Sequence, residues 1–281
     1  MLDRKKIVKT VMGRIAGISG AFERAFGSTT LIVGFHRVND QMPEDGLTCG
    51  SAKFEAFCRF FRKYARVVPL SEQVAACREG KDMSGTVSIT FDDGYLDNFE
   101  VAAPILHRLQ MPATFFITSG FIGSQVIPPW DVELVRQPGW MTWDHLRSLV
   151  AQGFEIGCHT DTHIDMGRAD ADTVRRELEV SKQKINQELG ITVQLFAYPF
   201  GDRQNISDCS RQLVRDLGFV CCASSHGGLN AVGTSPFHLQ RVPIAEWFAT
   251  PDQFGFEFVR GLWQRNKVWA SSDSSPAGAR D

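Results

Sequence analysis

Apolar positions along the chain switch repeatedly between short runs or a period of two and a period near 3.6. Residues 31–35 form a continuous apolar run, which is typical of a strand buried on both faces. We expect further strands at residues 86–91, 113–117, 154–157, 195–198, 219–222 and 237–242. Helical spacing predicts helices at residues 52–64 with Ser51 as N-cap, 96–109 with an interruption at Pro104, 143–151, 172–189, 207–217 and 251–263.

Strands that alternate with helices in this way are parallel and joined by crossover helices. For a chain of 281 residues, this number of strands favours an α/β fold that is a distorted (β/α) barrel of about seven parallel strands in a single domain. The first strand is not followed by the GxGxxG pattern of dinucleotide-binding folds. We expect an amphipathic helical segment at residues 1–30, the barrel at 31–265, and a disordered tail rich in Ser, Ala and Gly at 266–281.

Composition excludes several classes of protein. The formal net charge of −2 gives no field that would attract nucleic acid. Seven cysteines at irregular spacing, without a CxxC pair, indicate reduced thiols and favour a cytoplasmic location.

The first residues are basic, but Arg14, Glu23 and Arg24 interrupt the apolar segment that a signal peptide needs. There is no apolar run of 18 residues that would make a transmembrane segment. We therefore expect a basic amphipathic helix, either packed on the barrel or in peripheral contact with a membrane. The oligomeric state is left open.

Candidate chemical groups follow the predicted strands. They are His36, the pair Asp92-Asp93, the His159-x3-His163 pair and Phe200. Active sites of parallel barrels lie at the carboxyl ends of the strands, so these residues should meet at one rim. Two imidazoles and one carboxylate suit one divalent metal ion, with zinc as the default and cobalt, nickel or iron as alternatives. A helical turn from His159 to His163 would place both rings on one face, and Asp161 and Asp165 could orient the rings.

Three segments in this order carry a family resemblance: TFDDGYLDN from Thr90, HTDTH from His159 and FAYPFG from Phe196. With them, residues 31–242 resemble the polysaccharide deacetylase (NodB-homology) family, carbohydrate esterase family four. The resemblance implies metal-dependent removal of N-acetyl groups from an acetylated amino sugar or polysaccharide. It further implies that Asp92 is the general base, that Asp93, His159 and His163 hold the metal, and that the backbone N–H of Phe200 binds the oxyanion.

The chain departs from the family pattern twice. The third motif lacks its initial Arg, for which Arg241 is a substitute within reach of Asp92, unless Arg241 forms a structural salt bridge. No suitable His follows His238 as general acid. His36 replaces it if the chain is similar to the circularly permuted exopolysaccharide deacetylase branch, in which the acid-bearing strand comes first; otherwise His36 is structural.

Trp143, Tyr95 and Arg241 are candidate substrate contacts, and Trp130 and Trp143 near the rim could stack on a sugar. An acetylated carbohydrate is the expected partner. The alternatives are an O-acetyl esterase, a small cyclic-amide hydrolase, or an inactive glycan-binding subunit.

Overall fold

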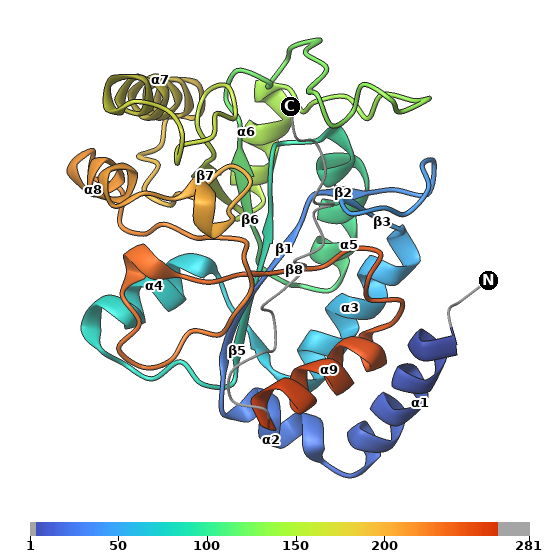
Figure 1. The fold of residues 1–281 in the computed structure, drawn as a ribbon. Coiled ribbons are helices and arrows are strands. Elements are labelled where there is room, and N and C mark those ends of the chain that lie inside the picture. The colour runs from blue at the N-terminus through green and yellow to red at the C-terminus, as the bar shows by residue number, and fades with distance from the viewer. Residues whose placement is uncertain (1–3, 264–281) are drawn as a thin grey trace, which may run out of the picture.

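The computed structural model describes residues 4–263, in which strands alternate with helices as the sequence predicts (Figure 1). The strands are β1 (Thr30–Phe35), β2 (Arg37–Val38), β3 (Thr48–Cys49), β4 (Arg66–Val67), β5 (Thr86–Phe91), β6 (Thr114–Ile117), β7 (Glu155–Cys158) and β8 (Val242–Pro243). The helices are α1 (Arg4–Ile18), α2 (Ala21–Gly27), α3 (Ser51–Tyr64), α4 (Leu70–Glu79), α5 (Ala103–Arg108), α6 (Trp143–Ala151), α7 (Ala171–Leu189), α8 (Asp208–Asp216) and α9 (Pro251–Trp263).

The main sheet is parallel throughout and runs in the order β7-β6-β5-β1-β8, with β4 beside the start of β5. Single parallel bridges continue it beyond β7, from Cys158 to Phe196, from Ala197 to Ala223 and from Ala223 to Leu239. Leu239 leads into β8, which pairs with β1. The pairing therefore returns to its starting strand, as expected of a distorted barrel.

Both faces of β1, β5 and β6 are buried. Side chains such as Leu31 and Val33 of β1 pack outward against the surrounding helices in the larger core cluster. Ile32, with the opposite parity, belongs to a smaller cluster inside the ring, made of Ile32, Leu70, Val74, Phe116, Leu195, Ala197, Cys221, Ala223 and Leu239. Since Leu70 and Val74 belong to α4, this helix contributes side chains to the inside of the ring. The sequence pattern did not predict α4.

Several predicted elements differ in the structure. Residues 237–242 are not one strand: Pro236–His238 form a 3₁₀ turn, because Pro236 fixes φ and the Ser235 hydroxyl caps the turn. Residues 195–198 and 219–222 contribute single bridges at or next to the predicted ranges instead of ladders.

Helix starts also differ in detail. Helix α3 begins at Ser51 with Gly50 as N-cap, since the Ser51 hydroxyl bonds Asp40 instead of its own helix. The predicted helix at 96–109 is a π-helical turn over Asn98–Ala102 followed by α5, with Pro104 in the first turn of α5. The predicted interruption at Pro104 thus corresponds to a helix start.

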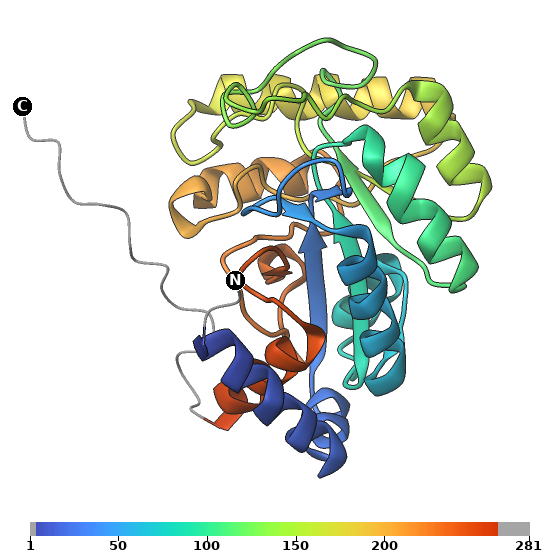
Figure 2. The same cartoon turned by 90° about the vertical axis from the view of Figure 1, so that its right-hand side faces the viewer.

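The N-terminal segment forms α1 and α2, and α1 lies beside α9 at the edge of the molecule (Figures 1 and 2). Within residues 4–263, no helix is long and apolar enough to cross a membrane. All seven cysteines are unpaired, in agreement with the predicted reduced thiols. The predicted disordered tail at 266–281 lies outside the described residues, and the cytoplasmic location stays a prediction.

Candidate active site

The two adjacent carboxylates leave β5 in different directions. The N–H of Asp92 donates to the carbonyl of Phe35 (3.0 Å), which continues the β5–β1 pairing and keeps Asp92 facing inward like Thr90. Asp93 then adopts a left-handed φ of 74° and Gly94 a φ of 93°. A Cβ on Gly94 would lie 2.8 Å from the Ile122 side chain, so the turn requires glycine there.

Asp93, His159 and His163 form a compact, buried cluster in which the potential ligand atoms lie within 4.8 Å of one another. Asp93 Oδ1 lies 3.2 Å from His163 Nε2 and 3.5 Å from His159 Nε2. Contrary to expectation, the segment from His159 to His163 is not helical. Thr160 (φ 65°) and His163 (φ 60°) are left-handed, and this loop turns both rings to Asp93.

The cluster fits a cation. The ring of His159 is oriented by the backbone carbonyl of Ala197, 2.8 Å from Nδ1, and not by Asp161 or Asp165. Since a carbonyl only accepts, Nδ1 carries the proton and Nε2 presents a lone pair to Asp93. Burial lowers the pKa of His159 to about 4, which keeps this ring neutral at pH 7.

Asp93 Oδ1 is buried without a hydrogen-bond partner among the described residues. Burial disfavours its ionised form, but the neighbouring histidines His163, His36 and His159 together outweigh this effect and hold the pKa of Asp93 below its ordinary value. A carboxylate oxygen and an imidazole lone pair that face one another without a donor between them are the donor set of a divalent metal.

Asp92 does not belong to this cluster. Both of its oxygens accept from Arg241, each at 2.7 Å, in a bidentate pair. Burial opposes ionisation, but Arg241, together with His159 and His36, outweighs it and lowers the pKa of Asp92, so the carboxylate is ionised at neutral pH. The contact between Arg241 and Asp92 that the sequence suggested is therefore present.

Arg241 is fully buried, and its remaining contacts are with the protein. It donates to the carbonyl of Ser224 (3.0 Å) and to the hydroxyls of Thr90 (3.1 Å) and Ser225 (2.8 Å). With these bonds and the pair to Asp92, all five N–H groups have acceptors. A direct sugar contact by Arg241 would have to break one of them.

We expect Arg241→Ala to lower the free energy of unfolding by about 3–5 kcal/mol, because the buried Asp92 carboxylate would lose its cation. Denaturant titration measures the change. Arg66→Ala is the matched control, since Arg66 binds Glu72 at 2.7 Å on the exposed surface and should contribute less than about 1 kcal/mol. Equal losses in the two variants would contradict the structural role of the buried pair.

His36 lies at the end of β1 and faces the carboxylate pair. Its Nε2 is 3.8 Å from Asp92 Oδ2, and its side chain is 22% exposed. Its backbone carbonyl accepts from the Asn98 side chain at 2.6 Å, which fixes the turn after the strand. His36 thus combines solvent access with proximity to the reacting groups, as a proton donor requires.

Phe200 follows Pro199 in a left-handed conformation (φ 62°). Its ring is about half exposed and meets the ring of His163 edge-on, with centroids 4.7 Å apart. Its backbone N–H donates to no acceptor found among residues 4–263. It is therefore free to donate to a substrate.

The other predicted substrate contacts lie deeper. Tyr95 is fully buried, donates to Asp131 (2.9 Å) and accepts from the Trp130 indole N–H (2.8 Å). A sugar contact by Tyr95 would require this network to open. Trp143 is half-buried at the start of α6 and packs against the main core, so its sugar contact stays a prediction.

No pattern in the sequence indicated the ion pairs that support this site. Arg37, which follows His36, is buried and pairs with Asp131 and with Asp45, the latter at 2.9 Å. The pair fixes the loop that carries Trp130, whose ring contacts that of His163 at 4.6 Å between centroids. Trp130, which the sequence suggested for sugar stacking, thus packs beside the Asp93, His159 and His163 cluster.

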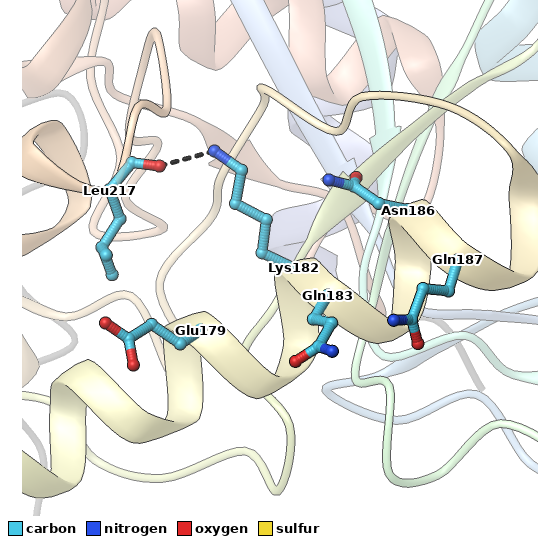
Figure 3. A pocket seen from close by; sticks show the side chains of 6 residues that line it. All are labelled: Glu179, Lys182, Gln183, Asn186, Gln187 and Leu217. Carbon is cyan, nitrogen blue, oxygen red and sulfur yellow. Dashed lines mark hydrogen bonds between the residues drawn. The ribbon is translucent and has the colours of Figure 1, made fainter.

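One cavity, of about 320 Å³, lies elsewhere, between α7 and the end of α8 (Figure 3). Its lining is Glu179, Lys182, Gln183, Asn186, Gln187 and Leu217, and the Lys182 ammonium donates to the carbonyl of Leu217. None of these residues contacts Asp93, His159 or His163.

Residues 79–222, about half of the chain, match the sequence model described as polysaccharide deacetylase. Poly-beta-1,6-N-acetyl-D-glucosamine N-deacetylase of Staphylococcus aureus is 25% identical over 160 residues, which cover 53% of this chain and 52% of the relative. The match thus spans about half the length of this curated relative.

Two solved structures have the same fold. They are the Streptococcus pyogenes deacetylase PplD in complex with acetate (TM-score 0.68, 19% identity, 80% of this chain and 96% of that one) and IcaB from Ammonifex degensii (TM-score 0.67, 21% identity, 82% and 96%). The matched range contains Asp92, Asp93, His159, His163 and Phe200, whereas His36 and Arg241 lie outside it. On the match over half of its length, this chain belongs to the polysaccharide deacetylase family.

Proposed function

We propose that this protein is a metal-dependent hydrolase that removes N-acetyl groups from an acetylated amino sugar or polysaccharide. The observation that carries the proposal is the Asp93, His159 and His163 cluster beside an ionised Asp92 that stays outside it. Family membership supports it, as does the relative whose name states N-deacetylation of a poly-N-acetylglucosamine.

Asp93, His159 and His163 would hold one divalent metal ion, zinc in our proposal, although the same donors suit cobalt, nickel or iron. When bound, the ion supplies Lewis-acid polarisation of the acetyl carbonyl and lowers the pKa of water next to it. The chain contributes fixed ligands: the ring of His159 is oriented by Ala197, and that of His163 is packed against Trp130 and Phe200.

Asp92 takes the proton from the attacking water. Arg241 keeps it ionised beforehand and fixes its plane, so the carboxylate meets the water without rotating. The Phe200 N–H donates to the oxyanion that forms as the water oxygen bonds to the acetyl carbon. The carbon–nitrogen bond then breaks, His36 gives its proton to the departing amine, and acetate and a free amino sugar result.

The role of His36 can be tested by comparing substrates. We expect His36→Ala to lower kcat for N-deacetylation by about a hundredfold or more, because an amine leaves poorly without a proton. Hydrolysis of p-nitrophenyl acetate should be nearly unchanged, since its leaving group needs no acid. In the unchanged protein, kcat/KM for the amide should fall as pH rises and the acid is deprotonated, and the variant should lack this decline.

His238→Ala is the matched control, because His238 lies in the Pro236–His238 turn and does not face the carboxylate pair. It should leave both reactions unchanged. Equal loss of the amide and ester reactions in His36→Ala would instead indicate that His36 is structural.

The reaction itself is tested by measuring acetate and free amine together. We expect equal amounts of both from β-1,6-linked or β-1,4-linked N-acetylglucosamine oligomers, only after metal loading. Acetate from O-acetylated xylan oligomers alone would favour an esterase. Release from no acetylated substrate, with oligomer binding retained, would identify an inactive glycan-binding protein.

A further inference from the structure

Helix α1 (Arg4–Ile18) presents its polar and small side to the rest of the protein. The Lys6 ammonium donates to the carbonyl of Glu246 (2.8 Å), and the Thr10 hydroxyl bonds that of Thr250 (3.0 Å). Gly13 is the buried residue of the helix, and a Cβ there would lie 1.9 Å from the carbonyl oxygen of Asp252. Small and polar residues thus let α1 pack closely against α9.

The opposite side of α1 is apolar and exposed. Its exposed side chains are Ile7 (47%), Val8 (61%), Val11 (50%), Met12 (44%), Ile15 (56%) and Ile18 (88%). At 3.6 residues per turn they fall within an arc of about 140°. We call these six side chains the α1 face. A surface helix of a soluble protein buries its apolar arc, so α1 has the reverse arrangement.

Every charge on α1 is positive: Arg4, Lys5, Lys6, Lys9 and Arg14, with no acidic residue in Arg4–Ile18. Helical geometry places Arg14 at one border of the α1 face, Lys5 at the other, and Arg4 at its N-terminal end. Arg14 contacts Asp252 at 3.4 Å, yet its side chain remains mostly exposed. An apolar arc bordered by cations matches the apolar interior and anionic head groups of a lipid surface.

We propose that the α1 face binds the surface of an anionic lipid bilayer, with the helix lying in the plane of the interface. This inference goes beyond the proposed function and does not depend on it.

Two other occupants fit the α1 face less well. A second copy would bring further positive charges on its own α1 and no acidic residue of Arg4–Ile18 to pair with them, which is unfavourable across an interface. Residues 264–281 contain Val268 and Trp269 as their only large apolar side chains, too few to cover six. A lipid surface complements both the apolar arc and the charge.

The test is sedimentation of the full chain with vesicles of phosphatidylcholine and phosphatidylglycerol (7:3) or of phosphatidylcholine alone. We expect binding to the anionic vesicles that weakens as salt rises, and little binding to the neutral ones. Arg4→Gln with Lys5→Gln should lower the partition coefficient by roughly fivefold for each cation. Val11→Asp with Ile15→Asp should abolish binding.

Val132→Asp with Val135→Asp is the matched control, since both side chains are exposed and belong to the loop between β6 and α6, which lies at the end of the molecule away from α1 (Figures 1 and 2). It should bind vesicles as the unchanged protein does. The α1 variants should keep the far-UV circular dichroism spectrum and the unfolding midpoint of the unchanged protein, which shows that they are folded. Three results would overturn the proposal. They are no binding of the unchanged chain, equal loss in the control, or a dimer in sedimentation velocity that Val11→Asp with Ile15→Asp converts to a monomer.

Discussion

Asp92→Asn is expected to lower kcat for deacetylation by at least about a hundredfold while the protein keeps its bound metal. Asn has nearly the same shape as Asp but cannot take a proton from water. The metal should remain because Asp92 points to Arg241, with both oxygens at 2.7 Å, and is not part of the Asp93 cluster. Acetate release and metal content are measured on the same preparation.

The matched control for this variant is Asp165→Asn. Asp165 lies in the loop after His163 and bonds Gly167 N–H (2.9 Å) and Asn205 (2.8 Å), so it touches neither Asp92 nor the ligands. The Asp165→Asn variant should therefore deacetylate as fast as the unchanged protein. If Asp92→Asn is instead free of metal and excess zinc restores its activity, Asp92 is a ligand and the roles of the two carboxylates are reversed.

His163→Ala should lower metal affinity by orders of magnitude, because it removes one of only three protein ligands. We expect one metal per chain in the unchanged protein and close to none in the variant after dialysis. Activity should fall with the metal content. Metal analysis measures the number of metal ions per chain, and a competition titration against a chelator measures the affinity.

His226→Ala is the control for His163→Ala. His226 is not one of the proposed ligands, and its Nδ1 contacts the carbonyl of Gly227. This variant should retain one metal. An unchanged metal content in His163→Ala would exclude the Asp93, His159 and His163 assignment.

The sequence carried much of the fold because buried parallel strands leave continuous apolar runs. The runs at residues 31–35 and 86–91 correspond to β1 and β5, whose ends bear His36 and the carboxylate pair. Helix α6 spans the predicted residues 143–151, and the hydroxyl of its N-cap, Thr142, accepts from the His145 N–H. Convergence of the ligands followed from the rule that strand ends meet at one rim.

What failed depends on backbone geometry or on distant partners. A spacing of four suggested a helical turn for His159 and His163. Instead, the left-handed φ angles of Thr160 and His163, which residues other than glycine rarely adopt, orient the two rings. The Arg37–Asp131 pair joins residues far apart in sequence, and no local pattern marks it. Single-bridge strands such as the one at Ala223 are too short to give a clear period.

Arg241 lies between these two cases. The absence of an Arg in the third motif raised the question of what holds Asp92, and the rim geometry offered Arg241 from a neighbouring strand. Only the structure shows the bidentate contact and the three further acceptors that bury the guanidinium. Both Arg241 and His36 lie outside the range that matches the family, so their proposed roles are argued from the geometry of the site.

The central claim, that one metal ion at Asp93, His159 and His163 supports deacetylation, is tested most directly by titrating metal-free protein with zinc. Bound zinc and acetate release from an N-acetylglucosamine oligomer are followed together. We predict no release without metal, a rise in proportion to bound zinc, and an end point at one zinc per chain. The claim would be contradicted if the metal-free protein released acetate. It would also be contradicted if His163→Ala reached the same end point of one zinc per chain.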